Sequence, residues 1–219
     1  MVIAIDGPGG VGKSTVSRAV ARELGLAYLD TGATYRAATV AVLTAGIDVT
    51  DCDAILREVT ARSIDYGSNG ITLDAVPINA HVRSSEVTAH VSAVSAHAPV
   101  RAYIVGLQRR WVHNHGGSAV VEGRDIGTVV FPLADVKIFL TARPEVRAAR
   151  RAGDFESTGT SIGEIASALA ARDDADSSRA ASPLRPADDA TVIDTSDIDI
   201  SGVVDRVLDL VATSEDDHT

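Results

Sequence analysis

Residues 7–14 read Gly7-Pro8-Gly9-Gly10-Val11-Gly12-Lys13-Ser14, directly after the apolar run Val2-Ile3-Ala4-Ile5. Beyond them, apolar residues recur at helical spacing over 14–24. A strand, a glycine-rich loop and a helix form the context in which G-x-x-x-x-G-K-S builds a phosphate-binding loop. The glycines let successive backbone N–H groups point at one anion, and the helix adds its positive N-terminal end. The stretch therefore predicts a nucleoside triphosphate site.

Within this loop, each polar side chain has a chemical task. Lys13, one of two lysines in the chain, can reach the β- and γ-phosphates. The Ser14 hydroxyl can ligate Mg²⁺, so we expect Mg²⁺ as the cofactor, with ATP as the phosphoryl donor. The expected ATP-binding residues are Gly7, Pro8, Gly9, Gly10, Val11, Gly12, Lys13, Ser14 and Thr15.

Composition limits the remaining classes of protein. The chain has 219 residues, of which 45% are hydrophobic and 23% charged, as in one globular α/β domain. Its net charge of −10 argues against a general nucleic-acid or membrane-surface binder. Its single cysteine, Cys52, excludes an internal disulfide and suits a reducing compartment. With no membrane-length apolar stretch and a strand from the second residue onward, we expect a cytoplasmic location and no membrane or nucleic-acid partner.

Short apolar runs alternate with helical patterns along the chain. Runs rich in β-branched residues are typical of strands covered on both faces, as in a parallel sheet. The alternation predicts an α/β, P-loop nucleoside triphosphate hydrolase-like three-layer fold with a five-stranded parallel sheet. Its ligands would gather at the carboxyl edge, next to Gly7, Asp30 and 122–125. The further strands are expected at 26–29, 119–121, 136–140 and 191–193, and the helices at 14–24, 34–45, 100–114, 144–151, 161–172 and 202–212.

Two segments interrupt the alternation. Residues 63–80 alternate polar and apolar side chains around Asn69-Gly70, which predicts a small β insertion. Residues 152–160 are polar, contain glycine and connect two helices. They are typical either of a lid that closes over phosphates or of a plain solvated connector. Arginines on both sides favour the lid: Arg147, Arg150, Arg151, Arg172 and Arg179.

The chemistry of the acceptor narrows the class further. A guanine-specific switch would carry Asn-Lys-x-Asp, whereas the two lysines here follow Gly12 and Val136. Among kinases, an alcohol acceptor benefits from a base, but a phosphate acceptor is already ionised. Its difficulty is electrostatic, since two polyanions must be brought together. The many arginines therefore favour a phosphorylated acceptor.

Four segments together resemble the bacterial cytidylate kinases, a family of nucleoside monophosphate kinases. They are 5–14, 30–36 (Asp-Thr-Gly-Ala-Thr-Tyr-Arg), 122–132 (Glu-Gly-Arg-Asp-Ile-Gly-Thr-Val-Val-Phe-Pro) and 172–184, and the similarity runs from residue 2 to about residue 212. The resemblance implies one domain over 1–219. Its core would cover 1–62 and 95–212, its β-containing monophosphate-binding insertion about 63–94, and its short lid about 147–161. We expect a monomer.

The resemblance also implies an activity and its residues: transfer of the ATP γ-phosphoryl group to CMP or dCMP, in pyrimidine nucleotide metabolism. Arg124 would hold the CMP phosphate. Asp125 would accept from the cytosine amino group, because a carboxylate only accepts and N4 only donates. The implied catalytic residues are Lys13, Arg124, Arg147, Arg151 and Arg172. The implied CMP-binding residues are Thr31, Tyr35, Arg36, Ser92, Arg101, Arg124, Asp125, Asp176 and Arg179.

Alternatives remain open for these assignments. Arg124 and Asp125 could form only a local salt bridge, and Asp176 could belong to a solvated acidic run with Asp173 and Asp174. The acceptor could be another small molecule, such as UMP or shikimate. The chain could also be a nucleotide-binding module or switch. Thr31 and Glu122 stand where many family members have serine and aspartate, and both keep the functional group.

Overall fold

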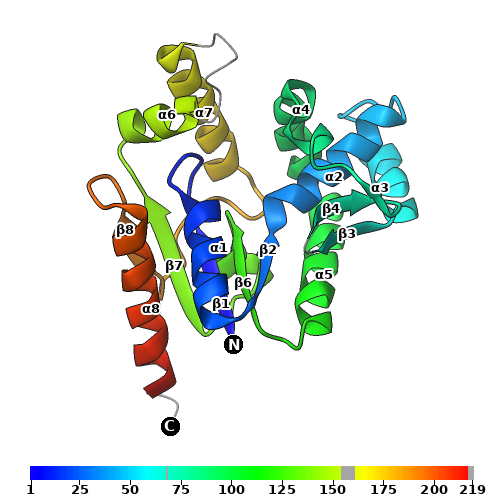
Figure 1. Cartoon of the computed structure of the whole chain (residues 1–219). Coiled ribbons are helices and arrows are strands. Elements are labelled where there is room, and N and C mark those ends of the chain that lie inside the picture. Colours follow the sequence, from blue (N-terminus) through cyan, green and yellow to red (C-terminus); the bar gives the residue numbers. More distant parts are fainter. Residues whose placement is uncertain (68, 154–160, 217–219) are drawn as a thin grey trace. The chain divides into compact units, whose positions relative to one another are not determined.

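The protein is described by a computed structural model covering residues 1–67, 69–153 and 161–216 (Figure 1). The chain divides into two compact units, and each is described by itself. One consists of Met1–Tyr28 with His115–Thr219, and the other of Leu29–Asn114. No helix among these described residues is both long and apolar enough to cross a bilayer.

The larger sheet has five strands in the order β2-β6-β1-β7-β8, of which β6, β1, β7 and β8 lie wholly in the first unit and β2 begins there. The central strand β1 pairs in parallel with β6 and β7, so that Asp6 lies opposite Gly123 and Phe139. The prediction of a five-stranded parallel sheet is thereby confirmed. The strands are β1 (Val2–Asp6), β2 (Ala27–Asp30), β6 (Ala119–Gly123), β7 (Val136–Thr141) and β8 (Thr191–Asp194).

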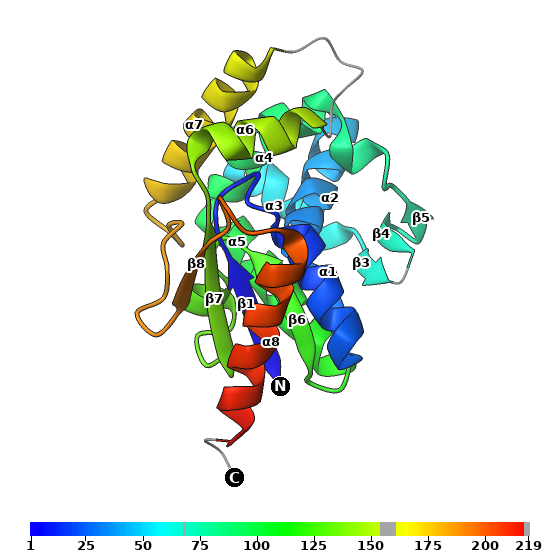
Figure 2. The same ribbon diagram turned by 60° about the vertical axis from the view of Figure 1, so that its left-hand side comes forward.

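Two helices lie side by side against one face of this sheet, α1 and α8 (Figures 1 and 2). Val16 and Val20 of α1 pack with Ile3 and Ile5 of β1 in one buried cluster. Each such fully buried side chain stabilises the fold by about 1.5–3 kcal/mol. The α-helices of this unit are α1 (Lys13–Leu24), α6 (Pro144–Gly153), α7 (Ile162–Ser177) and α8 (Ile200–Asp216), and Ile126–Val130 form one turn of π-helix.

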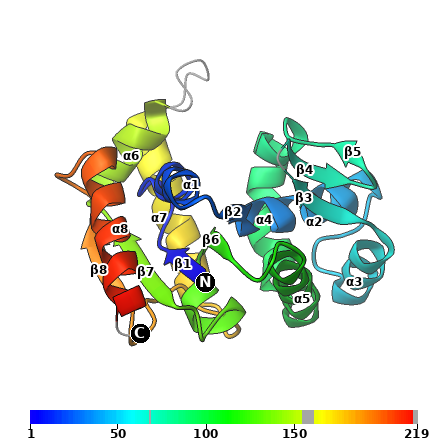
Figure 3. The same ribbon diagram turned by 60° about the horizontal axis from the view of Figure 1, so that its bottom comes forward.

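The second unit combines helices with a small antiparallel sheet of β3, β4 and β5 (Figure 3). The β insertion predicted around Asn69-Gly70 is confirmed, since β3 pairs with β4 across this turn. Gly70 adopts a φ of +99°, which only glycine takes readily. The elements are α2 (Thr31–Thr44), α3 (Cys52–Ala61), β3 (Ile64–Gly67), β4 (Gly70–Leu73), β5 (Val76–Pro77), α4 (Ser85–Ala96) and α5 (Ala98–Asn114).

Helices α3 and α4 were not predicted from the sequence. Each begins at a side-chain cap: Asp51 accepts from the Ala54 N–H at 2.9 Å, and Ser84 accepts from the Val87 N–H at 3.2 Å. These cap residues mark both helix starts in the sequence, and in α3 the buried Ile55 and Val59 also have helical spacing.

The structure describes all but one residue of the predicted insertion but only part of the predicted lid. The insertion, 63–94, falls inside the second unit, which is larger at both ends. Of the predicted lid, 147–161, the first residues belong to α6, and residues 154–160 lie outside the described residues. The function of both segments stays a prediction.

Candidate phosphotransfer site

The glycine-rich loop joins β1 to α1, with Gly12 capping the helix and Lys13 as its first residue. Gly10 has a φ of +80°, and a Cβ there would meet the backbone oxygen of Arg147 at 2.8 Å. Only glycine fits this position, for both conformational and steric reasons. The loop therefore passes close to α6, which carries Arg147.

Lys13 lies among other cations. Its ammonium group donates to the Pro8 carbonyl at 2.7 Å. Burial and the neighbouring charge of Arg124 lower the pKa of Lys13 from 10.5 to about 7, although the carboxylate of Glu122 opposes the shift. The first unit thus gathers positive charge around the loop.

Glu122 connects the start of α1 to the end of β6. Its carboxylate accepts from the Ser14 hydroxyl at 3.0 Å and, on its other oxygen, from the Tyr28 hydroxyl. Glu122 is buried, at 3% exposed. Oxygen ligands of this kind suit Mg²⁺, so Ser14 and Glu122 fit the expected cofactor. Among the described residues, no three His, Cys, Asp or Glu side chains form a metal-binding group.

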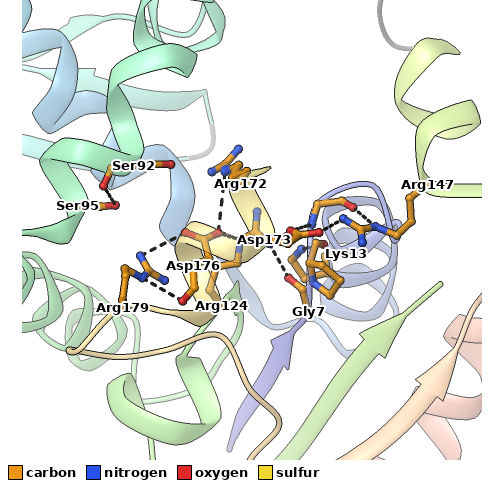
Figure 4. A network of polar contacts seen from close by, with 12 residues as sticks. Gly7, Lys13, Ser92, Ser95, Arg124, Arg147, Arg172, Asp173, Asp176 and Arg179 are labelled. Atoms are coloured by element: carbon orange, nitrogen blue, oxygen red, sulfur yellow. Dashed lines mark hydrogen bonds and ion pairs between the residues drawn. The ribbon is translucent and has the colours of Figure 1, made fainter. Parts of the chain in front are cut away.

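Two aspartates on one face of α7 bind several arginines (Figure 4). Arg124, directly after β6, pairs with Asp173 at 3.2 Å and with Asp176 at 3.1 Å. Asp176 also pairs with Arg179 at 3.4 Å and Arg172 at 4.0 Å. Asp176 is only 4% exposed, so the alternative of a solvated acidic run is wrong for it.

The arginines of α6 have distinct partners. Arg147 donates from Nε to the Gly9 carbonyl at 2.7 Å and from Nη2 to Asp173. Arg150 instead donates to the hydroxyl and the carbonyl of Thr195, after β8, at 2.9 and 2.7 Å. The structure therefore brings Lys13, Arg124, Arg147 and Arg172 together, while Arg150 holds the loop after β8. The clamp role of Arg151 stays a prediction.

The remaining predicted acceptor ligands lie in the second unit. The buried Arg101 of α5 stacks its guanidinium 5.1 Å from the centre of the Tyr35 ring and donates to the Ser95 carbonyl at 3.2 Å. Ser95 donates in turn to the carbonyl of Ser92, one turn earlier on α4. The unit thus places Tyr35 and Arg101 together, with Ser92 close by.

Thr31 and Arg36, both on α2, complete the predicted set in this unit. Thr31 is 4% exposed, and its carbonyl accepts from the Thr34 hydroxyl at 2.7 Å. Arg36 donates to the Val82 carbonyl and the Thr88 hydroxyl, both at 2.9 Å. Arg36 is therefore held by the segment that leads into α4.

Sequence reasoning assigned no role to Asp173, although it lies beside the loop. The helix was predicted to end at 172, whereas α7 continues to Ser177. Within a helix, spacing of three residues puts Asp173 and Asp176 on one face and leaves Asp174 outside it. The three-residue spacing of Asp173 and Asp176 was the sequence signal that could have predicted their shared role. For Glu122, the sequence predicts a place at the ligand-binding edge of the sheet and a departure from the family pattern, but not its bond to Ser14.

The fold and this site define a P-loop phosphotransferase. The family model for cytidylate kinase matches residues 3–213. Proteins named cytidylate kinase from Streptomyces avermitilis and Mycobacterium avium are 50% and 49% identical to this chain, each over 96% of it and over 92% and 95% of their own lengths. The chain belongs to the cytidylate kinase family.

A solved structure supports the fold alone. An uncharacterized protein from Eubacterium ventriosum superposes with a TM-score of 0.53 at 11% sequence identity. The match covers 97% of this chain and 98% of that one.

Proposed function

We propose that the protein transfers the γ-phosphoryl group of ATP to CMP or dCMP, giving CDP or dCDP and ADP. The observation that carries this proposal is the ion-pair network joining Arg124 to Arg147 and to the glycine-rich loop through Asp173. Arg124 is the expected ligand of the acceptor phosphate, and Arg147 is an expected clamp on the transferring group. A phosphate acceptor needs such positive charge and no catalytic base.

The donor half of the reaction belongs to the loop and α1. Backbone N–H groups of Gly7 to Thr15, with the Lys13 ammonium, would bind the triphosphate. Mg²⁺, held through Ser14 next to Glu122, would neutralise phosphate charge and orient the γ-phosphoryl group. Lys13, Arg147, Arg151 and Arg172 would stabilise the charge that spreads over the transferring oxygens.

The acceptor half is assigned by the resemblance to residues of both units. In the first unit, Arg124 would bind the CMP phosphate, and Asp176 and Arg179 would contact the ribose. The buried Asp125, at 4% exposed, would accept from the cytosine amino group. In the second unit, Arg36 would bind phosphate, and the stacked pair Tyr35 and Arg101 supports a base-binding role. Thr31 and Ser92 complete this set.

A panel of acceptors tests the proposal. The purified protein with Mg-ATP is given CMP, dCMP, UMP, AMP, GMP or shikimate, and ADP release is measured. We expect release to depend on CMP or dCMP. Tight ATP binding without acceptor-dependent release would indicate a switch or binding module instead, and a preference for UMP or shikimate would identify another kinase.

Two substitutions test the assigned roles. Asp125→Ala should impair CMP phosphorylation far more than residual ATP hydrolysis, and equal loss of both would contradict its base-reading role. Arg124→Met should lower turnover by about 100-fold or more while ATP binding persists. Unchanged steady-state kinetics would refute the role of Arg124.

We also infer a cytoplasmic, monomeric enzyme without nucleic-acid or membrane partners. The single cysteine supports a reducing compartment, and the net charge of −10 argues against nucleic-acid and membrane partners. Light scattering coupled to size-exclusion chromatography tests the oligomeric state.

A further inference from the structure

The Asp173 carboxylate connects three segments of the first unit. Its Oδ1 accepts from the Gly9 N–H at 3.4 Å and from Arg124 at 3.2 Å, while its Oδ2 accepts from Nη2 of Arg147. These donors lie in the glycine-rich loop, after β6 and on α6 (Figure 4). One side chain thus holds both arginines that are expected to contact the two substrates.

Asp176, three residues later, has a different set of partners. It pairs with Arg124, Arg172 and Arg179. Among the ion pairs of the described residues, Arg147 is bound to Asp173 and not to Asp176. Asp173 is therefore the carboxylate that joins Arg124 to Arg147. Its charge also counters the repulsion among Lys13 and these arginines, which would otherwise spread apart.

The bonds to Asp173 use only part of each guanidinium. On Arg124, Nε and Nη1 are bound, to Asp176 and to Asp173 with the Gly7 carbonyl. On Arg147, Nε and Nη2 are bound, to the Gly9 carbonyl and Asp173. Within the described part of the chain, Nη2 of Arg124 and Nη1 of Arg147 have no hydrogen-bond partner. Each arginine is thus fixed on one side and keeps one donor group for another acceptor.

We propose that Asp173 is a positioning residue for phosphoryl transfer: it orients Arg124 and Arg147 so that their remaining donors meet the acceptor phosphate and the transferring phosphoryl group. This inference rests on the proposed function. Asp173 acts through the two arginines and does not itself contact substrate. Its effect should therefore fall on turnover more than on binding.

The first test compares Asp173→Asn with Asp174→Asn. Both remove one negative charge from the same turn of α7, but Asp174 is exposed. We expect Asp173→Asn to lower kcat for CMP by about 10- to 100-fold, because small misplacements of catalytic groups cost this much, with KM for ATP and CMP changed less than about 3-fold. Asp174→Asn should match the wild type. A loss confined to KM, or a higher kcat, would overturn the proposal.

A double-mutant cycle tests whether Asp173 acts through Arg147. If it does, Asp173→Asn should have a smaller effect on kcat in an Arg147→Met background than in the wild type. Losses that multiply would overturn the coupling. Asp173→Glu keeps the charge at a shifted position, so we expect an intermediate kcat. It also provides a second variant if Asp173→Asn fails to fold.

A measurement that does not depend on activity tests the positioning role of Asp173 separately from the proposed function. Hydrogen exchange at the Arg147 Nη2–H, which donates to Asp173, is followed by ¹⁵N NMR and should accelerate by about 10-fold in Asp173→Asn or Asp173→Glu and not in Asp174→Asn. Unchanged exchange in the Asp173 variants would overturn the positioning role. If the wild type failed to phosphorylate CMP, the proposed function would fail, and this exchange experiment would still decide whether Asp173 orients Arg147.

Discussion

Ser14 donates a hydrogen bond of 3.0 Å to Glu122, which lies 108 residues further along the chain. The hydroxyl proton therefore points at the carboxylate, and the lone pairs of the Ser14 oxygen can face a cation. Because the second carboxylate oxygen accepts from Tyr28, the Glu122 side chain is held at both ends. Partners of this kind orient metal ligands and tune their affinity.

Glu122→Gln should weaken the use of Mg²⁺. The amide has one acceptor oxygen for two hydroxyl donors and lacks the negative charge. We expect the Mg²⁺ concentration for half-maximal activity to rise by about 10-fold. Tyr28→Phe, which leaves the Ser14 bond in place, should change it less. An unaltered Mg²⁺ dependence in Glu122→Gln would rule out this role for Glu122.

Arg101→Lys should impair the acceptor selectively. Lysine lacks the planar fork that stacks on the Tyr35 ring and reaches the Ser95 carbonyl. We expect KM for CMP to rise by about 10-fold, with KM for ATP unchanged. Arg110→Lys, at an exposed position of the same helix, should change neither KM and serves as the control. A parallel rise in both KM values would point to general disruption of the fold.

Asp176→Asn should destabilise the protein. The substitution removes the buried negative charge that pairs with Arg124 and Arg179, and Arg124 keeps its pair with Asp173. We expect a loss of about 2–4 kcal/mol in the free energy of unfolding, measured in urea. The exposed Asp174→Asn should cost less than about 0.5 kcal/mol. Equal effects of the two variants would show that the Asp176 pairs contribute little.

Asp6 should make stability depend on pH. Burial raises its pKa from 3.8 to about 6, although the N–H groups of Gly127 and Ile126 oppose the rise. The folded state therefore binds the Asp6 proton more tightly than the unfolded state. Protonation of Asp6 stabilises the folded state fully below pH 3.8, and this contribution is lost as the pH rises through about 6. Relative to Asp6→Asn, the wild type should lose about 1–3 kcal/mol between pH 4 and 7. Urea titrations at several pH values measure the difference, and parallel curves would contradict the raised pKa.

Two glycines of the loop offer a matched comparison. Gly10 and Gly12 have φ values of +80° and +91°, but a Cβ would meet backbone only at Gly10. Gly12→Ala should therefore cost about 1–2 kcal/mol through strain alone. Gly10→Ala should cost more and should also raise KM for ATP. Urea denaturation and steady-state kinetics provide both readouts, and equal costs would exclude the steric effect.

Much of the fold could be predicted because its signals are local. The runs 2–5 and 119–121 are continuously apolar, and the run 136–140 is apolar except for Lys137, which is typical of strands covered on both faces. Helices α3 and α4 were not predicted, because their starts are marked by the cap residues Asp51 and Ser84, which a search for apolar spacing does not use. Within the site, the loop could be assigned from its own residues, whereas the remaining roles needed the resemblance to a family.

The sequence by itself determined the phosphate-binding loop and the α/β class, since contiguous residues carry the strand, the turn and the helix. Only the tertiary structure decided which charges pair. Asp173 meets Arg147 across 26 residues, Arg124 across 49 and Gly9 across 164. The physical reason is that the parallel sheet brings the ends of distant strands to one edge, where α7 can present one helical face to all three. Asp173 and Asp174 are neighbouring residues of the same type. They differ only in the direction in which they leave α7, so Asp173 pairs with the arginines and Asp174 is exposed.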